Sequence, residues 1–119
     1  MQSAYDAFQE GNRLLASQNP HAAVIALERA RDLEPDKASV RETLARAYYG
    51  SGRFAQAGEE FERAVEIEPV NDYAHFGLGL CLMRRGDRIG ARRHLKLAVA
   101  MRPDQADYRA ALARVADDA

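Results

Sequence analysis

The sequence contains a single cysteine, no tryptophan and almost no net charge. One cysteine, Cys81, cannot form an intramolecular disulfide or a thiolate metal cluster, and a chain without disulfides fits a reducing compartment. A formal net charge of -1 gives the whole chain no strong attraction to nucleic acid or to anionic lipid. These scarcities exclude a disulfide-rich scaffold and a generally basic nucleic-acid-binding protein.

Long apolar runs are also missing from the chain. No uninterrupted apolar segment approaches the roughly 20 residues that a helix needs to cross a bilayer, so no membrane partner is predicted. Residues 1–6 lack a basic head followed by an apolar stretch, so we expect no signal peptide. With 119 residues and 47% hydrophobic content, we expect a single domain over residues 1–119 and a cytoplasmic location.

A repeat of 34 residues organises the sequence. The prolines of three dipeptides, Glu34-Pro35, Glu68-Pro69 and Arg102-Pro103, lie 34 residues apart. On that period the chain divides into units 4–37, 38–71 and 72–105 without insertion or deletion. Small residues share positions in all three units, and so do large apolar residues. The small positions hold Gly11, Ala45 and Gly79, then Ala23, Ala57 and Ala91, then Ala30, Ala64 and Ala98, and the large positions hold Leu14, Tyr48 and Leu82, then Leu27, Phe61 and Leu95, then Leu33, Ile67 and Met101.

Each unit predicts two amphipathic helices joined by a short turn. In the second unit, apolar residues recur at i, i+4, i+7 and i+8 from Val40 to Tyr48, which indicates the first helix. Glycines in residues 50–52 end it, and Pro69 ends the second helix because proline cannot continue a helix. One hairpin of about 34 residues cannot bury its apolar face alone, so the units must stack.

The repeat resembles the tetratricopeptide repeat over residues 4–105. The family's small, aromatic and proline positions are matched by Gly11, Ala23, Ala30, Pro35, Ala45, Tyr48, Ala57, Phe61, Ala64, Pro69, Gly79, Ala91, Ala98 and Pro103. The sequence departs from the family pattern at two positions that affect how tightly the helices pack. The usual tryptophan position holds Ala7, Arg41 and His75, and Glu10 replaces a usual leucine. The resemblance implies an all-α fold, a right-handed α-solenoid of three helix hairpins plus a capping helix over residues 106–119. It implies seven helices, with no matching cap at the N-terminal end.

The resemblance also implies a concave groove lined by the first helix of each pair. The inward positions hold aromatic, methionine and arginine residues, which is the composition of interaction hot spots. The candidate peptide-binding residues are Asn12, Thr43, Arg46, Tyr49, Tyr73, Phe76, Leu80, Met83 and Arg84. Arginines pair with carboxylates, so we predict an adaptor, co-chaperone or assembly factor whose protein or peptide partner is apolar with acidic residues. Alternatively, the aromatic residues pack on one another, and Tyr5 and Phe8 shield the first hairpin.

One known binding mode of the family can be tested on the residues. Some members clamp the C-terminal carboxylate of heat-shock chaperones with Lys, Asn, Asn, Lys and Arg at set inward positions. The corresponding residues here are Phe8, Asn12, Thr43, Tyr73 and Gly77. Only Asn12 matches, so the sequence argues against that clamp.

Charge is distributed unevenly between the units. The second helix of unit two is acidic, with Glu59, Glu60, Glu62, Glu66 and Glu68, and unit three is basic, with Arg84, Arg85, Arg88, Arg92, Arg93, Lys96 and Arg102. We expect pairing and a solvated face, since exposed ion pairs contribute only about 0–1 kcal/mol each. Two alternatives stay open: a homodimer through these charges or the first hairpin, and binding of RNA or an acidic partner by unit three. The aromatic residues lie on the opposite wall, which disfavours single-stranded nucleic acid.

The sequence offers no constellation of catalytic or metal-binding residues. The histidines occupy different repeat positions without the spacing of a metal site: His21, His75 and His94. We expect His75 to be a half-buried packing residue, Cys81 a small core hydrophobe, and Glu59 and Glu60 exposed. The prediction is a protein without enzymatic activity, cofactor or metal.

Overall fold

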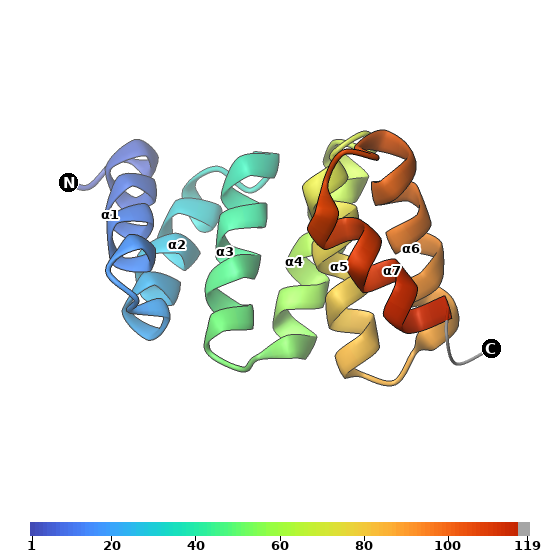
Figure 1. Ribbon diagram of the computed structural model, residues 1–119. Coiled ribbons are helices and arrows are strands. Elements are labelled where there is room, and N and C mark those ends of the chain that lie inside the picture. Colours follow the sequence, from blue (N-terminus) through green and yellow to red (C-terminus); the bar gives the residue numbers. More distant parts are fainter. Residues whose placement is uncertain (117–119) are drawn as a thin grey trace.

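The computed structural model describes residues 1–116. Within this range the chain forms seven α-helices and no strand, as the sequence predicts (Figure 1). The helices are α1 (Ala4–Ala16), α2 (Pro20–Leu33), α3 (Ala38–Gly50), α4 (Phe54–Ile67), α5 (Asp72–Arg84), α6 (Arg88–Met101) and α7 (Ala106–Ala116). The last three residues of the predicted capping helix, 117–119, lie outside the described residues.

The turn inside each hairpin has the same geometry three times. Gln18, Gly52 and Gly86, at equivalent repeat positions, have φ angles of 61°, 78° and 84°. These values lie in the left-handed region, which glycine adopts without steric cost. One residue later, the backbone N–H donates to a carbonyl five residues earlier, for example from Arg53 to Tyr48 at 2.8 Å. This hydrogen bond caps the C-terminus of the first helix, and the chain reverses direction there.

Polar side chains start four of the helices. The hydroxyl of Ser3 accepts the N–H of Asp6 at the start of α1, and Asn71 accepts the N–H of Ala74 at the start of α5. Asn19 and Asp87 cap α2 and α6 in the same way, and Pro20 occupies the first turn of α2. These caps satisfy backbone donors that have no partner within the helix.

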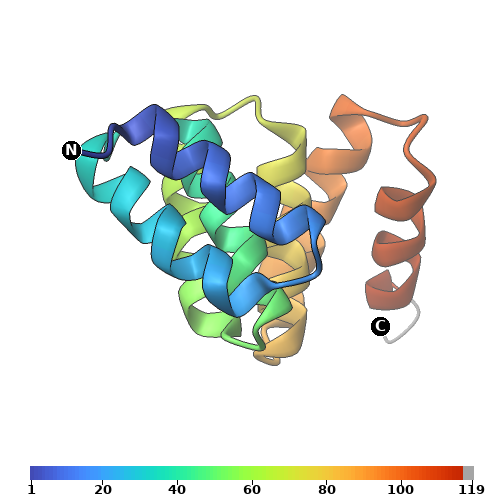
Figure 2. The same cartoon turned by 90° about the vertical axis from the view of Figure 1, so that its left-hand side faces the viewer.

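The seven helices stack into an elongated body of 52 × 25 × 23 Å, with the described ends of the chain at opposite ends (Figures 1 and 2). Each helix packs on the next, and α1 also contacts α3, α3 contacts α5, and α5 contacts α7. Within residues 1–116, no Cα atom of α4 comes within 8 Å of a Cα atom of α2 or α6. The odd-numbered helices therefore line the narrower, concave side of the stack, as expected from stacked helix pairs.

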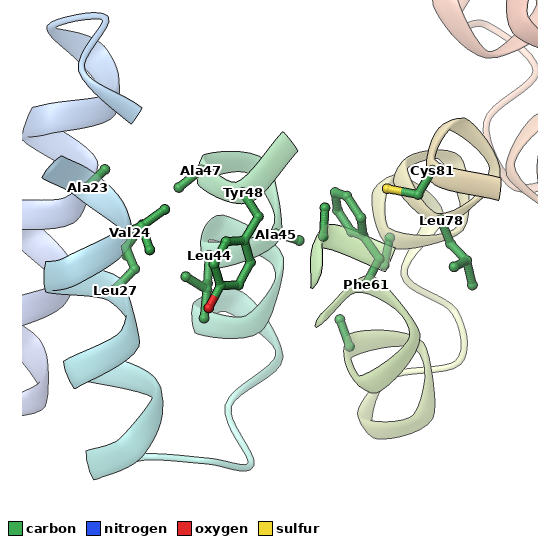
Figure 3. Packing of buried hydrophobic residues seen from close by; sticks show 13 residues of the cluster. Ala23, Val24, Leu27, Leu44, Ala45, Ala47, Tyr48, Phe61, Leu78 and Cys81 are labelled. Carbon is green, nitrogen blue, oxygen red and sulfur yellow. The ribbon is translucent and has the colours of Figure 1, made fainter. Parts of the chain in front are cut away.

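The main core runs along α2, α3, α4 and α5. Leu27 and Leu44 are fully buried between the first two hairpins, and Phe61 and Leu78 continue this core into the third (Figure 3). A second cluster, with Leu95 and others, holds α7 against the third hairpin. These clusters show why the hairpins need one another: each buries its apolar face only against its neighbours.

The small repeat positions are explained by close approach of the helices within a hairpin. A Cβ atom added to Gly11 would lie 2.4 Å from Cγ of Leu27, and one added to Gly79 would lie 2.7 Å from Cγ of Leu95. Both distances are too short for real atoms. A larger residue at either position would therefore push the paired helices apart.

The outer face of α1 is charged at positions where the internal helices are apolar. Asp6, Glu10 and Arg13 are exposed, whereas their equivalents in α3, from Val40 to Ala47, are buried. These charges interact readily with water and would be costly to bury. A polar outer face thus caps this end of the stack, although the sequence predicts no cap there.

The usual tryptophan position carries hydrogen-bond donors in three helices. Arg41 and His75 each reach back six residues to the carbonyl oxygen of Pro35 or Pro69, both at 2.9 Å, and Arg109 of α7 does the same with Pro103. Each bond satisfies a carbonyl in the loop between hairpins. The departure from the family pattern is therefore compensated by a polar contact that recurs at every junction between hairpins.

The carboxylate of Glu60 is buried, and the prediction that it is exposed was wrong. Glu60 is 7% exposed, and its oxygens accept hydrogen bonds from Arg31 of α2 and Arg41 of α3, both at 2.9 Å. Burial lowers the pKa of Arg31, but the hydrogen bond and charge of Glu60 outweigh it and raise that pKa above its ordinary value. Glu60 thus joins three helices of the first two hairpins.

His75 and His94 lie side by side, although their repeat positions predict no such pair. Their rings stack at 5.3 Å between centroids, and the two Nδ1 atoms are 3.1 Å apart. His75 is 4% exposed, more buried than expected. Since Nε2 of His75 lies 2.9 Å from the carbonyl oxygen of Pro69, a neutral His75 donates there and accepts from His94 through Nδ1. Burial, His75 and Arg93 lower the pKa of His94, and Asp87 opposes them.

Folding stability should decrease as the pH falls below about 6.5, the ordinary pKa of His94. The unfolded chain takes up a proton on this residue before the folded chain does, so acid favours unfolding. Urea denaturation between about pH 7.5 and 5.5 measures the effect, with His94→Asn as the comparison. The variant should lose less stability than the wild type over this range, and an identical pH dependence would contradict the prediction.

Cys81 is a core residue, as the sequence predicts. Its side chain is fully buried in the main cluster, close to Gly58 of α4. Burial raises the pKa of the Cys81 thiol to about 12, although Arg85 acts in the opposite direction. At neutral pH the thiol is therefore protonated, and a protonated, buried thiol is a poor nucleophile.

Candidate functional site

The concave side contains an apolar cavity between α3 and α5. It measures about 200 Å³ and is lined by Arg46, Tyr49, Gly50, Phe61, Tyr73, Phe76, Gly77 and Leu80. Arg46, Tyr49 and Gly50 come from α3, and all the others except Phe61 come from α5. Pockets of this composition, mostly apolar with one or two polar groups, are typical of ligand sites.

One glycine of α5 lets a core residue reach this cavity. Phe61 reaches it from α4, a helix of the convex side, because Gly77 has no side chain in the way. A Cβ atom added to Gly77 would lie 2.3 Å from Cζ of Phe61. The ring of Phe61 is part of the core (Figure 3) and also part of the cavity wall.

A second hollow of about 250 Å³ continues the first toward α7. It is lined by Tyr49, Leu80, Met83, Arg84 and Arg114. An overlapping cavity of about 400 Å³ adds Phe76, Asp107, Ala110 and Ala111. Because Tyr49 and Leu80 line all three spaces, the spaces adjoin one another, and together they are called the groove from α3 to α7.

Arg84 is held in place by aromatic rings. Its guanidinium carbon lies 4.9 Å from the ring centroid of Phe54 and 5.8 Å from that of Tyr49, and its Nε donates to the Tyr49 hydroxyl at 3.3 Å. The two rings contact each other edge to face. Cations are attracted to aromatic faces, so the positive charge has a fixed position at the groove edge.

Aromatic rings in the wall of the groove form a continuous row. Tyr73 lies 6.1 Å from both Phe61 and Phe76, and Phe76 stacks on Tyr108 of α7 at 4.6 Å. The Tyr108 hydroxyl donates to Asp72 at 2.7 Å, which holds α7 at this position. Burial raises the pKa of Tyr73, with Arg46 lowering it and Glu42 adding to the rise. The alternative that these aromatics pack on one another is thus partly realised, and the cavity remains beside them.

Seven of the nine predicted residues line the groove: Arg46, Tyr49, Tyr73, Phe76, Leu80, Met83 and Arg84. Asn12 and Thr43 do not line these three cavities. Asn12 is half-buried on α1, and Thr43 is 7% exposed with its hydroxyl bonded to the carbonyl of Ser39 at 2.8 Å. The sequence predicts Phe61 only as a core residue, and no signal in the sequence of α4 indicates that its ring also lines the cavity.

The described residues offer little for other kinds of site. No group of three or more His, Cys, Asp or Glu side chains in residues 1–116 could hold a metal ion. Among the same residues, no helix has the length and apolarity needed to cross a membrane.

Two family models described as tetratricopeptide repeat match residues 8–69 and 49–115, each more than half of the chain. Among curated proteins, the TPR repeat-containing thioredoxin TTL4 of Arabidopsis thaliana is 33% identical over 107 residues, 90% of this chain and 16% of that protein. The tetratricopeptide repeat and J domain-containing co-chaperone DNJ1 of Cryptococcus neoformans is 33% identical over 102 residues, 86% of this chain and 20% of that protein. The chain thus spans a fifth or less of these relatives.

Solved structures of other repeat domains have the same fold. The first TPR of Spaghetti (RPAP3), bound to the HSP90 peptide SRMEEVD, has a TM-score of 0.93 at 17% identity, over 98% of this chain and 93% of that one. The Arabidopsis OM64 TPR domain has a TM-score of 0.93 at 19% identity, over 98% and 97%. Such low identities show the fold alone. The family matches and the repeated hairpins together show that this chain belongs to the tetratricopeptide repeat family.

Proposed function

We propose that this chain is a protein-interaction module that binds a segment of a partner protein in the concave groove between α3 and α7. The observation that supports it most is the groove itself: adjoining cavities on the concave side of the stack, apolar between α3 and α5 and more polar toward α7, with Arg46, Arg84 and Arg114 among their lining residues. Apolar and aromatic surface with arginine is the composition of binding hot spots. The proposed functional unit is the whole described stack, with repeats 4–37, 38–71 and 72–105 and the helix that begins at residue 106.

The charges of the groove favour an acidic partner. Within residues 1–116, none of the guanidinium groups of Arg46, Arg84 and Arg114 lies within 4.0 Å of a carboxylate oxygen. Asp107 at the α7 edge is the acidic residue that lines these cavities. A partner segment that is apolar with acidic residues would supply the missing carboxylates. The relatives support the class of function: one is named a co-chaperone, and the RPAP3 domain is described as bound to a peptide.

Affinity capture from the cytosol of the source cell tests the proposal. The tagged wild-type chain should retain partner proteins that a Tyr49→Ala, Arg84→Glu variant retains at least about tenfold less, the effect of removing hot-spot contacts. The matched control is Ile25→Ala, Arg92→Glu, which removes one exposed apolar side chain and reverses one arginine on α2 and α6, outside the groove. Thermal unfolding should show that all three proteins are folded.

Equal retention by the wild type and the groove variant would overturn the proposal. Self-association remains the alternative function, and a mass that rises with concentration would reveal it. The charged outer face of α1 disfavours the first hairpin as that interface, since Asp6 and Glu10 would lose water on contact. The cytoplasmic location also remains a proposal, which imaging of the tagged full-length protein can test.

A further inference from the structure

Resting on the proposed function, the geometry points to a more specific ligand: a segment with one large apolar anchor residue and an acidic residue three positions from it. The anchor enters the cavity between α3 and α5. The acidic side chain lies in the hollow between α5 and α7, which both Arg84 and Arg114 line. The groove therefore recognises a pattern of side chains, in addition to overall charge.

The anchor site suits an aromatic or large aliphatic side chain. Its volume is about 200 Å³, and an apolar cavity of about 150 Å³ in another protein accepts benzene. Its walls come largely from the rings of Phe61, Tyr73 and Phe76, and the missing side chain of Gly77 lets the Phe61 ring reach it. A ring in this site would contact other rings at the distances that aromatic pairs prefer.

Successive helices set the spacing between the anchor and the acidic residue. Equivalent positions on α3, α5 and α7 hold Arg46, Leu80 and Arg114. A line drawn across the three helices therefore passes a positive, an apolar and a positive side chain in turn. Packed helix axes lie about 8–10 Å apart. An extended chain advances about 3.3 Å per residue, so one helix spacing corresponds to about three residues.

The two sites differ in what they offer an acidic side chain. Arg84 is fixed against Tyr49 and Phe54, so its guanidinium is already ordered before binding. Preorganised donors lose less entropy when a ligand binds. Arg114 lines the same hollow, whereas Arg46 lines the apolar cavity. The hollow toward α7 therefore has two positive charges and is the stronger carboxylate site, even with Asp107 nearby.

Fluorescence anisotropy with labelled synthetic peptides tests this inference. The probe is a Gly/Ser peptide with a central Phe and one Glu three residues to each side, so that either chain direction presents an acid to the α7 hollow. Replacing Phe by Ala should weaken binding at least about tenfold, the loss of one buried ring. Replacing both Glu by Gln, or moving both to six residues from the Phe, should weaken it about fivefold.

Variants of the protein locate the contact. In an Arg114→Gln protein, the preference for the Glu peptide over the Gln peptide should fall well below fivefold, because one of the two charge partners in the hollow has gone. Arg92→Gln, on the convex helix α6, is the matched control and should preserve the fivefold difference. Both variants remove one exposed arginine and should unfold at the wild-type temperature.

The outcomes separate this inference from the proposed function. Equal binding of the peptides with near and displaced Glu, or an unchanged Glu preference in Arg114→Gln, would overturn the spacing rule alone. A probe that does not bind, while affinity capture still depends on Tyr49 and Arg84, would also overturn the rule and leave the groove proposal intact. If the capture experiment shows no groove dependence either, both fall.

Discussion

Replacing Glu60 by alanine should lower the free energy of unfolding by about 3 kcal/mol. The substitution leaves Arg31 and Arg41 without their shared carboxylate, in a place where their side chains are only 23% and 16% exposed. Uncompensated charges away from water are costly, and partial exposure of Arg31 puts the effect at the lower end of that seen for buried pairs. Such a loss is a large part of the stability of a small domain.

Denaturant unfolding of three variants isolates this contribution. Glu60→Ala should show the full loss, and Glu60→Gln a smaller one, because the amide oxygen still accepts one hydrogen bond. The control is Glu59→Ala, the adjacent exposed glutamate on α4, which should change stability by less than about 0.5 kcal/mol. If Glu60→Ala is as stable as Glu59→Ala, the three-helix bridge is not a stabilising element.

Replacing Phe61 by alanine should cost about 3–5 kcal/mol and also deprive the groove of a wall. The ring is 2% exposed, lies against Gly77 and contacts Tyr73, so its removal leaves a void at the junction of the second and third hairpins. Phe54→Ala, also on α4 but only half-buried, should cost less. Both values come from denaturant unfolding, and equal losses would contradict the assigned packing.

Gly77 supplies an independent check on that contact. Gly77→Ala alone should destabilise the protein by about 1–3 kcal/mol, because the added methyl group meets the Phe61 ring. In the Phe61→Ala background, the same substitution should cost much less, since the ring is gone. A double-mutant cycle measures this coupling, and strictly additive effects would show that the two residues do not touch.

The fold follows from features that repeat along the sequence, because each helix obeys local rules. The glycine turns, the prolines and the 34-residue spacing of small residues predict helix pairs, and the described residues form seven helices. Glu60 shows the limit of this reasoning. It lies next to Phe61 at the edge of the apolar stripe of α4. Its carboxylate can be buried because Arg31 and Arg41, from two other helices, form ion pairs with it.

The residues that line the candidate site were predictable where only the inward-facing side of a helix decides the lining. Arg46 and Leu80 line the groove because their repeat position faces the concave side. Thr43 does not line it, since its short side chain bonds to its own helix at Ser39. The contact between His75 and His94 depends on the angle and position at which α5 and α6 pack. The spacing of residues along one helix does not predict that packing.

The uneven ties between hairpins have a mechanical consequence. On the convex side, the Arg31–Glu60 ion pair fastens α2 to α4, whereas no ion pair or side-chain hydrogen bond joins α4 to α6 in the described chain. On its convex side, the junction of the second and third hairpins therefore lacks the polar contact that joins the first two, whereas on its concave side Arg84 donates to Tyr49. The apolar cavity lies at this junction. We expect that a change in curvature there would alter the width of the cavity, and with it the size of the anchor residue that fits.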